Sequence, residues 1–439
     1  MLGGVAGVQP TEVVIIGAGT VGEFATRAAL GLGASVKVFD NSVARLRRLQ
    51  IAVGNRVFTS IIKPKVLAKA IRRADVAIGA LRAPMGRTPC VVSEEMVEQM
   101  KELGLFGATI GVEYGGLGLK AGTYAKIVEK IAATWMSLSG IFNSHLIMAA
   151  CVERNGTEEQ KNHYLPKFAT GEIRGGLALT EPDAGTDLQG IKMRAKKDGD
   201  HYIINGTKTW ISNGIHGTCF ALLVKTDSSA DPAHKGMSCF IAEKGPGFTV
   251  SKKLEKLGYK GIDSAELIFQ DYKIHASKLI GGKEGRGMQT ALGGLELGRI
   301  NVAARGCGIA GAALMDAVKY AQIRHTFGKP IAEHQAIQLK LGEMATRLQA
   351  ARLLTYDAAR IYDKGERCDM EAGMAKYFAS EAALENATEC LRIHGGYGYS
   401  KEYHVERYYR DAPLMCIGEG TNEMQRIIIA RQMIARYPA

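Results

Sequence analysis

The spacing of apolar residues changes its period three times along the 439 residues, and this constrains the fold more than any single motif does. Residues 13–80 alternate short β-branched runs with helical segments, and residues 101–170 follow a helical period. Residues 175–280 present one strand-like run after another, and the chain is helical again after about residue 285. At roughly 100–200 residues per domain, such a chain builds two to four domains, each with its own core.

The first stretch has the pattern of a parallel sheet. Its uninterrupted apolar runs are residues 13–16, 35–40, 56–60 and 75–80. Between the first two runs, Phe24, Ala28 and Leu32 recur at helical spacing. Buried strands separated by helices indicate a sheet covered on both faces.

A glycine-rich loop joins the first strand to the first helix of this stretch. Gly17, Gly19 and Gly22 form a G-x-G-x-x-G motif, and Asp40 closes the second strand. Such glycines let backbone N–H groups approach a pyrophosphate, and an acid at Asp40 could accept the ribose hydroxyls of NAD. The alternative is a glycine-rich turn kept for packing. The motif predicts dinucleotide-binding ancestry.

The later stretches contain clear boundaries. Asn155-Gly156 predicts a break between two helices, with a new helix starting after Thr157. Asn205-Gly206 predicts a hairpin turn inside a block of antiparallel strands. A 4-3-4-3 apolar spacing near the end predicts the seam of a helical bundle, carried by Ile337, Leu341, Met344, Leu348, Ala351, Thr355 and Ala358.

Composition excludes several classes of protein. The net charge is +12, but basic and acidic residues are interspersed, so nucleic-acid binding is not expected. No apolar run reaches the ~20 residues of a membrane span, and no basic segment suggests a signal peptide. Eight scattered cysteines without C-x-x-C indicate reduced, cytoplasmic usage. His145, His163 and His201 are expected to be surface or packing residues, and we expect no metal site.

Five polar motifs occur in order through the second half of the chain. They are Leu179–Asp187 (LTEPDAGTD), Trp210–Gly214 (WISNG), Arg324–Pro330 (RHTFGKP) with Gln335 beyond it, His394–Gly398 (HGGYG) and Glu419–Glu423 (EGTNE). Together they resemble the acyl-CoA dehydrogenase family, from about Glu102 to the C-terminus. Residues 12–101 resemble instead the NAD-binding domain of alanine dehydrogenases, cut short at Lys101, without that family's catalytic domain.

The resemblance implies removal of a proton from Cα and a hydride from Cβ of an acyl-CoA thioester. That chemistry needs a base and a hydride acceptor, and because no side chain accepts hydride, a flavin is required. The family supplies FAD. Glu419 is expected to be the base, since apolar neighbours such as Leu414, Met415 and Ile417 should raise its pKa. Some family members place the base at the position of Gly298, which here has no side chain.

The family's other roles transfer onto matching positions. Leu179, Thr180, Trp210 and Ser212 would line the flavin ring; Thr186 would touch FAD and the pantetheine arm; Arg324, Phe327 and Gln335 would reach the pyrophosphate and adenine; His394, Gly395 and Gly396 would come from a neighbouring subunit; Thr421 and Asn422 would complete the FAD pocket; Thr186, Glu296, Arg299 and Gly420 would bind acyl-CoA. The implied partners are an electron-transferring flavoprotein and further copies of the chain, as a dimer of dimers.

The expected fold is therefore a multidomain α+β protein. A partial Rossmann-type α/β unit (1–101) precedes a helical remnant (102–174), an antiparallel β domain (175–282) and a C-terminal four-helix bundle (283–439). The family's first two or three helices are missing, which predicts an uncovered core and lower stability. A natural fusion, an assembly artefact and a constructed chimera all fit the junction. The alternative functions are an NAD(H)-binding oxidoreductase fragment and an inactive fusion.

Overall fold

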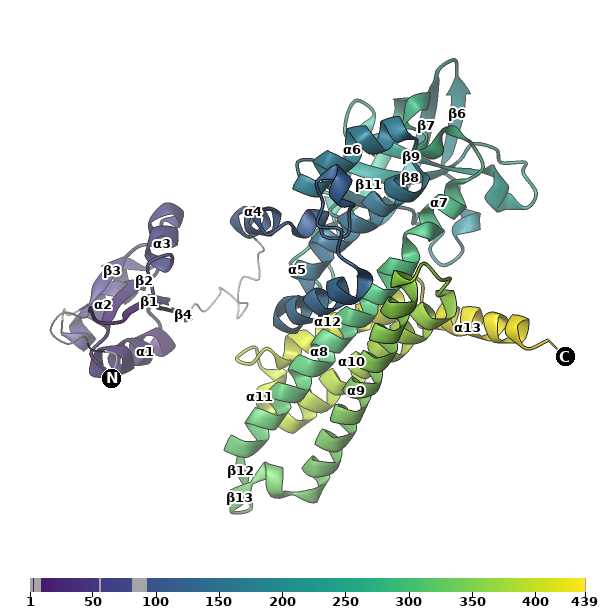
Figure 1. Ribbon diagram of the computed structural model, residues 1–439. Coiled ribbons are helices and arrows are strands. Elements are labelled where there is room, and N and C mark those ends of the chain that lie inside the picture. Colours follow the sequence, from purple (N-terminus) through teal and green to yellow (C-terminus); the bar gives the residue numbers. More distant parts are fainter. Residues whose placement is uncertain (1–2, 4–8, 55–56, 81–92, 439) are drawn as a thin grey trace. The chain divides into compact units, whose positions relative to one another are not determined.

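The computed structural model describes residues 3, 9–54, 57–80 and 93–438, and it divides the chain into two compact units. The first unit is Met1–Cys90 and the second is Val91–Ala439. Each unit has its own hydrophobic cores. Figure 1 labels the elements of both.

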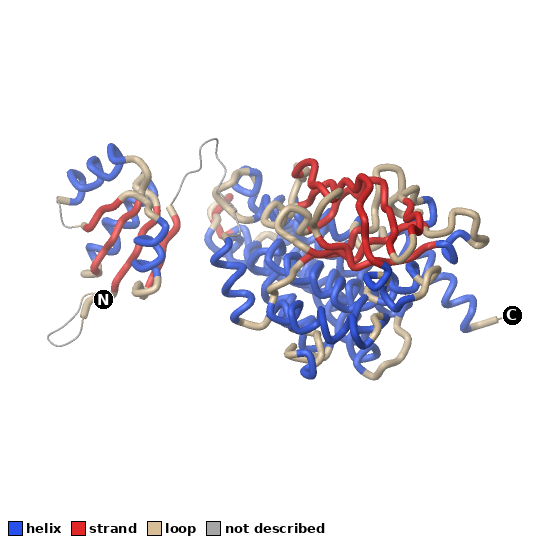
Figure 2. The backbone as a smooth tube through the Cα atoms, turned by 90° about the horizontal axis from the view of Figure 1, so that it is seen from above, coloured by secondary structure: helices blue, strands red, loops and turns tan. Residues whose placement is uncertain are grey.

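The first unit is the predicted parallel sheet with its helices. Its elements are β1 (Glu12–Ile16), α1 (Thr20–Gly31), β2 (Ser35–Phe39), α2 (Val43–Val53), β3 (Phe58–Ser60), α3 (Pro64–Ile71) and β4 (Val76–Gly79). The strands lie in the order β3-β2-β1-β4 and all are parallel, as in half of a Rossmann sheet. Figure 2 shows the strands of this unit in red beside its helices in blue.

Helix α1 confirms the predicted helix, and its structure shows which of its residues face the sheet. Phe24 and Leu32 are 66% and 52% exposed, whereas Gly22, Thr26 and Ala29 are buried. Gly22 permits this packing, because a Cβ there would lie 1.8 Å from the carbonyl oxygen of Gly17. The small residues therefore face the sheet and the larger ones face outward.

The second unit starts with helices. They are α4 (Glu94–Glu102), α5 (Ala121–Asn155) and α6 (Glu158–Thr170). The predicted break after Asn155 is confirmed, and Thr157 and Gln160 form a capping box at the start of α6. Helix α5 kinks at Trp135, where φ is −161° and ψ 110°. Within the described ranges it is the one helix long and apolar enough to cross a membrane, but its apolar stretch is mostly buried in this unit's core.

The β domain follows, with seven strands in one sheet. They are β5 (Gly175–Ala178), β6 (Arg194–Asp198), β7 (His201–Ser212), β8 (Cys219–Lys225), β9 (Met237–Glu243), β10 (Phe248–Lys253) and β11 (Ser264–His275). The path is β10-β11-β7-β6-β8-β5, and β9 pairs with β8. Most pairs are antiparallel, but β5 and β6 run parallel to β8.

The predicted hairpin at Asn205-Gly206 is wrong. Both residues lie inside the continuous strand β7, where its pairing with β11 shifts register between Phe269 and Tyr272. Gly206 has φ 146°, and Asn205 exchanges hydrogen bonds with Asp271 across the irregularity. Glycine is favoured in a bulge as well as in a tight turn, so Asn-Gly alone does not distinguish the two.

The rest of the second unit is a helical bundle. Its elements are α7 (Gly287–Gly293), α8 (Leu295–Ile323), β12 (His325–Thr326), β13 (Lys329–Pro330), α9 (Gln335–Asp363), α10 (Asp369–His394), α11 (Gly396–Tyr399), α12 (Val405–Ile417) and α13 (Asn422–Arg436). The predicted seam is confirmed: Met344, Leu348, Ala351, Thr355 and Ala358 are buried, and Ile337 and Leu341 pack against them. Helices α8, α9 and α10 lie side by side (Figure 1).

Candidate active site

The loop between α12 and α13 presents Glu419 in a constrained conformation. Glu419 has φ 56° and the following Gly420 has φ 87°, both in the left-handed region. A non-glycine residue held there costs about 1–3 kcal/mol, which the surrounding contacts must offset. Thr421 ends the loop by capping α13, its Oγ1 accepting from the backbone N–H of Met424 at 3.4 Å.

The carboxylate of Glu419 has one oxygen bound and one free. Its Oε1 accepts hydrogen bonds from Asn143 Nδ2 and Arg305 Nη2, both at 3.1 Å. Its Oε2 has no partner among the described residues and lies against Gly298, where a Cβ would be only 2.3 Å away. Burial raises the pKa of Glu419, while Arg305 and Lys376 oppose the rise. The result is a carboxylate with one unpartnered oxygen and a raised pKa.

Lys376 binds the loop that carries Glu419. This lysine of α10 is fully buried, and its Nζ donates to the carbonyl oxygens of Cys416 and Gly420 at 3.3 and 2.8 Å and to Asn422 Oδ1 at 2.8 Å. It therefore ties the end of α12 to the start of α13 across the loop. Burial lowers the pKa of Lys376 to about 8.

Helix α5 connects Glu419 with the end of strand β7. Asn143 of α5 bonds Glu419, and two residues earlier the carbonyl of Ile141 accepts from Asn213 Nδ2 at 2.9 Å. The same Nδ2 donates to the carbonyl of Gly175 at 2.9 Å. Ser212 precedes Asn213, and Trp210 nearby is 57% exposed with φ 61°. The end of β7, with the predicted flavin residues Trp210 and Ser212, thus lies beside the helix whose Asn143 bonds Glu419.

A buried ion pair orders the loop that carries Leu179 and Thr180. Lys208 Nζ donates to the carbonyl of Leu179 and to Glu181 Oε1, both at 2.8 Å, and both charged side chains are at least 94% buried. The backbone N–H of Thr209 donates to the carbonyl of Thr180 at 2.9 Å. Leu179 and Thr180 are half-buried beside β7, whereas Thr186 farther along the loop is exposed.

The other predicted cofactor residues lie at the opposite end of the bundle from the sheet (Figure 1). Arg324 caps α8, Phe327 lies in the β12–β13 turn, Gln335 begins α9, and His394–Gly396 link α10 to α11. His394 stacks on Tyr320 at 4.1 Å, which joins the ends of α8 and α10. Phe327 is 96% exposed. Within a single copy of the chain, these residues therefore lie far from Thr180, Trp210 and Glu419.

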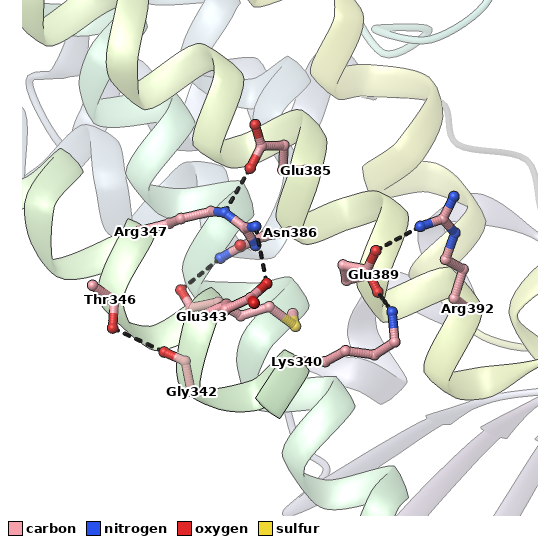
Figure 3. A network of polar contacts seen from close by, with 10 residues as sticks. Lys340, Gly342, Glu343, Thr346, Arg347, Glu385, Asn386, Glu389 and Arg392 are labelled. Carbon is pink, nitrogen blue, oxygen red and sulfur yellow. Dashed lines mark hydrogen bonds and ion pairs between the residues drawn. The ribbon is translucent and has the colours of Figure 1, made fainter. Parts of the chain in front are cut away.

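The face of α9 beyond Gln335 is hollowed and strongly charged. A hollow of about 640 Å³ is lined by Gln335, Gln338, Leu339, Gly342, Glu343, Thr346 and Arg347. Figure 3 shows that ion pairs tie this face to α10. Arg347 pairs with Glu343 and Glu385, and Glu389 pairs with Lys340 and Arg392.

The two acyl-CoA candidates on α8 lie at its first turns. Arg299 is buried and its Nε has no partner among the described residues, while the charges of Asp369, Glu296 and Glu419 act on it. Burial and the neighbouring Asp369 raise the pKa of Glu296. These nearby acids fit a structural ion-pair role for Arg299 as well as the predicted role in acyl-CoA binding.

In the first unit, backbone groups of the chain bind the carboxylate of Asp40, which was expected to bind a ribose. Asp40 is 3% exposed, and its oxygens accept the backbone N–H groups of Ala18 and Ser42, both at 2.7 Å. Gly19 has open space beside it, as a phosphate-binding loop needs. The loop keeps the Rossmann geometry, but Asp40 serves to fasten it to β2.

The histidines and cysteines lie in ordinary surroundings. His145 is buried between Phe106 and Phe168, its Nε2 lies 2.9 Å from the Phe168 carbonyl oxygen, and burial lowers its pKa to about 4. His163 is exposed, and His201 pairs with Asp200. In the described ranges no group of three or more His, Cys, Asp or Glu could hold a metal ion, and the seven cysteines there are free; Cys90 lies outside them.

Comparison with known proteins identifies the second unit. Three family models match in order: the acyl-CoA dehydrogenase N-terminal domain at residues 74–172, the middle domain at 176–272 and the C-terminal domain at 285–434. An acyl-CoA dehydrogenase of Bacillus subtilis (strain 168) is 42% identical over 342 residues, 77% of this chain and 89% of the relative. The chain belongs to the acyl-CoA dehydrogenase family.

Solved structures agree with this membership. The butyryl-CoA dehydrogenase from Megasphaera elsdenii matches with a TM-score of 0.76 at 38% identity, covering 79% of this chain and 91% of that one. A glutaryl-coenzyme A dehydrogenase in complex with glutaryl-CoA matches with a TM-score of 0.74 at 38% identity, covering 79% and 88%. This acyl-CoA dehydrogenase is therefore a flavoprotein oxidoreductase by family.

The first unit resembles a different family. Residues 1–112 match the model of the alanine dehydrogenase/PNT C-terminal domain, which confirms the resemblance seen in the sequence. That match overlaps the N-terminal acyl-CoA dehydrogenase model between residues 74 and 112. Helix α4 lies in the overlap and packs Val97 and Met100 into the core of the second unit.

Sequence reasoning missed the polar residues around Glu419. Asn143, Arg305 and Lys376 come from three different helices, and no motif contains them. A signal existed for two of them: Arg305 and Lys376 each interrupt a stretch of small apolar residues, where a charge is rare without a structural or functional reason.

Proposed function

We propose that this protein catalyses the FAD-dependent dehydrogenation of an acyl-CoA to the trans-2-enoyl-CoA, with Glu419 as the base that removes the α-proton. The observation that carries the proposal is the free Oε2 of Glu419, held by a left-handed loop against Gly298. A half-buried carboxylate with one unsatisfied oxygen and a raised pKa is suited to accept a proton from carbon.

Each residue around Glu419 has a distinct task in this proposal. Asn143 and Arg305 hold Oε1, so that only Oε2 is presented to the α-carbon. Lys376 fixes the backbone of the loop through Gly420. The backbone N–H of Glu419 would bind the thioester oxygen and so acidify the α-proton.

The residues around β7 suit a flavin. Trp210 offers an exposed aromatic face, and Thr180 and Ser212 add hydroxyl groups on neighbouring, well-anchored backbone. When bound, FAD supplies the acceptor for the β-hydride. The group at the far end of the bundle (Arg324, Phe327, Gln335 and His394–Gly396) would reach the FAD of another copy, which requires a homo-oligomer. Reduced FAD would pass its electrons to an electron-transferring flavoprotein.

The experiment is a bleaching assay on the purified protein. We expect absorbance near 450 nm from bound FAD, its loss on anaerobic addition of an acyl-CoA, and a CoA product two mass units lighter. Acyl-CoAs of different chain length and branching should be compared. A colourless protein that takes up no FAD, or a yellow one that no acyl-CoA bleaches, would contradict the proposal.

A further inference from the structure

Behind Glu419, the second unit encloses a group of polar side chains that a fatty acyl chain does not need. We call Tyr124, Asn143, Tyr259, Asn301 and Arg305 the Arg305 cluster; all five are at least 95% buried. Tyr124 and Asn143 come from α5, Asn301 and Arg305 from α8, and Tyr259 from the segment before β11.

Hydrogen bonds connect the cluster to the base. Asn301 Nδ2 donates to Tyr124 OH at 2.9 Å, Tyr124 OH donates to Asn143 Oδ1 at 3.3 Å, and Asn143 bonds Glu419. Arg305 donates from Nη1 to Tyr259 OH and from Nη2 to Glu419, both at 3.1 Å. Gly298, Asn301 and Arg305 are three and four residues apart, so they share the face of α8 that meets Glu419.

Polar atoms of the cluster remain without partners. Arg305 Nε and Asn301 Oδ1 have none among the described residues, although both side chains are buried. An alkyl chain packed here would leave these atoms unsatisfied, and each such group costs about 1–3 kcal/mol. A ligand with its own acceptor oxygens would satisfy them.

The charge of Arg305 is balanced through Glu419. Among the described residues Arg305 forms its ion pair with Glu419, and its other hydrogen bond goes to the neutral Tyr259 OH. Once Glu419 accepts the substrate proton it is neutral, and the buried guanidinium of Arg305 loses its counter-ion. A buried unpaired charge is strongly unfavourable, so a second anion near Arg305 would stabilise the state that follows proton removal.

We infer that the preferred substrate is the CoA thioester of a short dicarboxylic acid, whose far carboxylate binds Arg305 while Glu419 removes the α-proton. This rests on the function proposed above. Guanidinium and carboxylate form charge-assisted hydrogen bonds, and Arg305 Nε, which has no partner among the described residues, could donate to the ligand while Nη2 keeps its bond to Glu419. Glu419 would take the α-proton, and bound FAD would supply the acceptor for the β-hydride.

The test compares substrates that differ only at the far end. Purified holoenzyme is bleached anaerobically with glutaryl-CoA against pentanoyl-CoA and with succinyl-CoA against butyryl-CoA, since each pair exchanges a carboxylate for a methyl group. For at least one pair we expect the dicarboxylic member to half-saturate bleaching at a concentration lower by about tenfold or more.

Variants separate a substrate role of Arg305 from a role on the base alone. In Arg305→Gln, the half-saturating concentrations of the two members of a pair should become nearly equal, so that their ratio is close to one. Arg352→Gln, which breaks another helix-to-helix ion pair (Arg352–Glu129, 2.7 Å), should leave the ratio unchanged. FAD content and melting temperature verify that each variant is folded.

Two outcomes overturn the inference and are distinguishable. If wild type is bleached as well by the monocarboxylic members, and Arg305→Gln slows both members equally, then Arg305 serves only Glu419 and the proposed dehydrogenation stands. If no member of either pair, and no other acyl-CoA, bleaches the flavin, the proposed function fails together with this inference.

Discussion

Lys376 donates a hydrogen bond to the carbonyl oxygen of Gly420 at 2.8 Å, across 44 residues of sequence. This contact holds the residue after Glu419 in its left-handed conformation, and the same ammonium group binds Cys416 and Asn422. The conformation of the loop that carries Glu419 therefore depends on a buried cation of α10, which hydrogen-bonds the loop backbone.

Lys376→Met is expected to slow flavin bleaching roughly tenfold or more, since hydrogen bonds to a charged group contribute about 1.5–3 kcal/mol. The acid limb of the pH–rate profile should also move in this variant. The base acts when deprotonated, and Lys376 lowers the pKa that burial has raised, so its loss moves the rise in rate to higher pH. Stopped-flow bleaching across pH measures both effects.

Ser380→Ala is the control for that variant. It removes a neighbour of Asn422 in the same network but keeps the ammonium group, so the acid limb should stay in place. A Lys376→Met profile that keeps the wild-type midpoint would show that Lys376 has no electrostatic effect on Glu419.

Gly298→Ala tests the position of the free oxygen of Glu419. A Cβ at this position would lie 2.3 Å from Oε2 and 3.1 Å from Ile147 Cδ1, so the carboxylate must move. We expect slower bleaching with FAD still bound. Gly31→Ala, which places a Cβ in open space in α1, should bleach at the wild-type rate. Unchanged bleaching in Gly298→Ala would mean that Oε2 does not take the proton.

Lys208→Met tests the loop that carries Leu179 and Thr180. It leaves Glu181 buried without its counter-ion, which typically costs about 3–5 kcal/mol. The expected results are a lower melting temperature and weaker FAD retention on gel filtration. The double variant Lys208→Met/Glu181→Gln should recover part of the loss, because the uncompensated charge is gone. If the double variant is no better than the single one, the ion pair is not what orders the loop.

The first unit is expected to melt separately from the second. Its four-stranded sheet has its own small core, β4 is largely exposed, and apolar residues such as Ile51 and Phe58 face outward. In the second unit, Leu103, Val112 and Leu117 are exposed as well, as an uncovered helical core would be. Thermal unfolding followed by circular dichroism should show two transitions. Added FAD should raise the melting temperature of the second unit only. One transition that FAD shifts as a whole would contradict this.

The sequence predicted the features that depend on local periodicity. The strands of the parallel sheet, the break after Asn155 and the seam from Ile337 to Ala358 all follow from residues near one another in the chain. The Asn205-Gly206 hairpin failed for the opposite reason, since a bulge within β7 depends on its pairing with β11.

The surroundings of Glu419 could not be predicted in the same way. The motif singled out Glu419, but Asn143, Arg305 and Lys376 approach it from α5, α8 and α10 only through tertiary packing. Likewise the sequence suggested Asp40 as a ribose acceptor, whereas folding brings the N–H of Ala18 onto it.

The most direct test of the account is anaerobic bleaching of Glu419→Gln beside wild type. Glutamine keeps the shape of the side chain but is a far weaker base, so the account predicts a yellow protein with full FAD content that an active acyl-CoA no longer bleaches. Bleaching of this variant at the wild-type rate would contradict the assignment of Glu419 as the base.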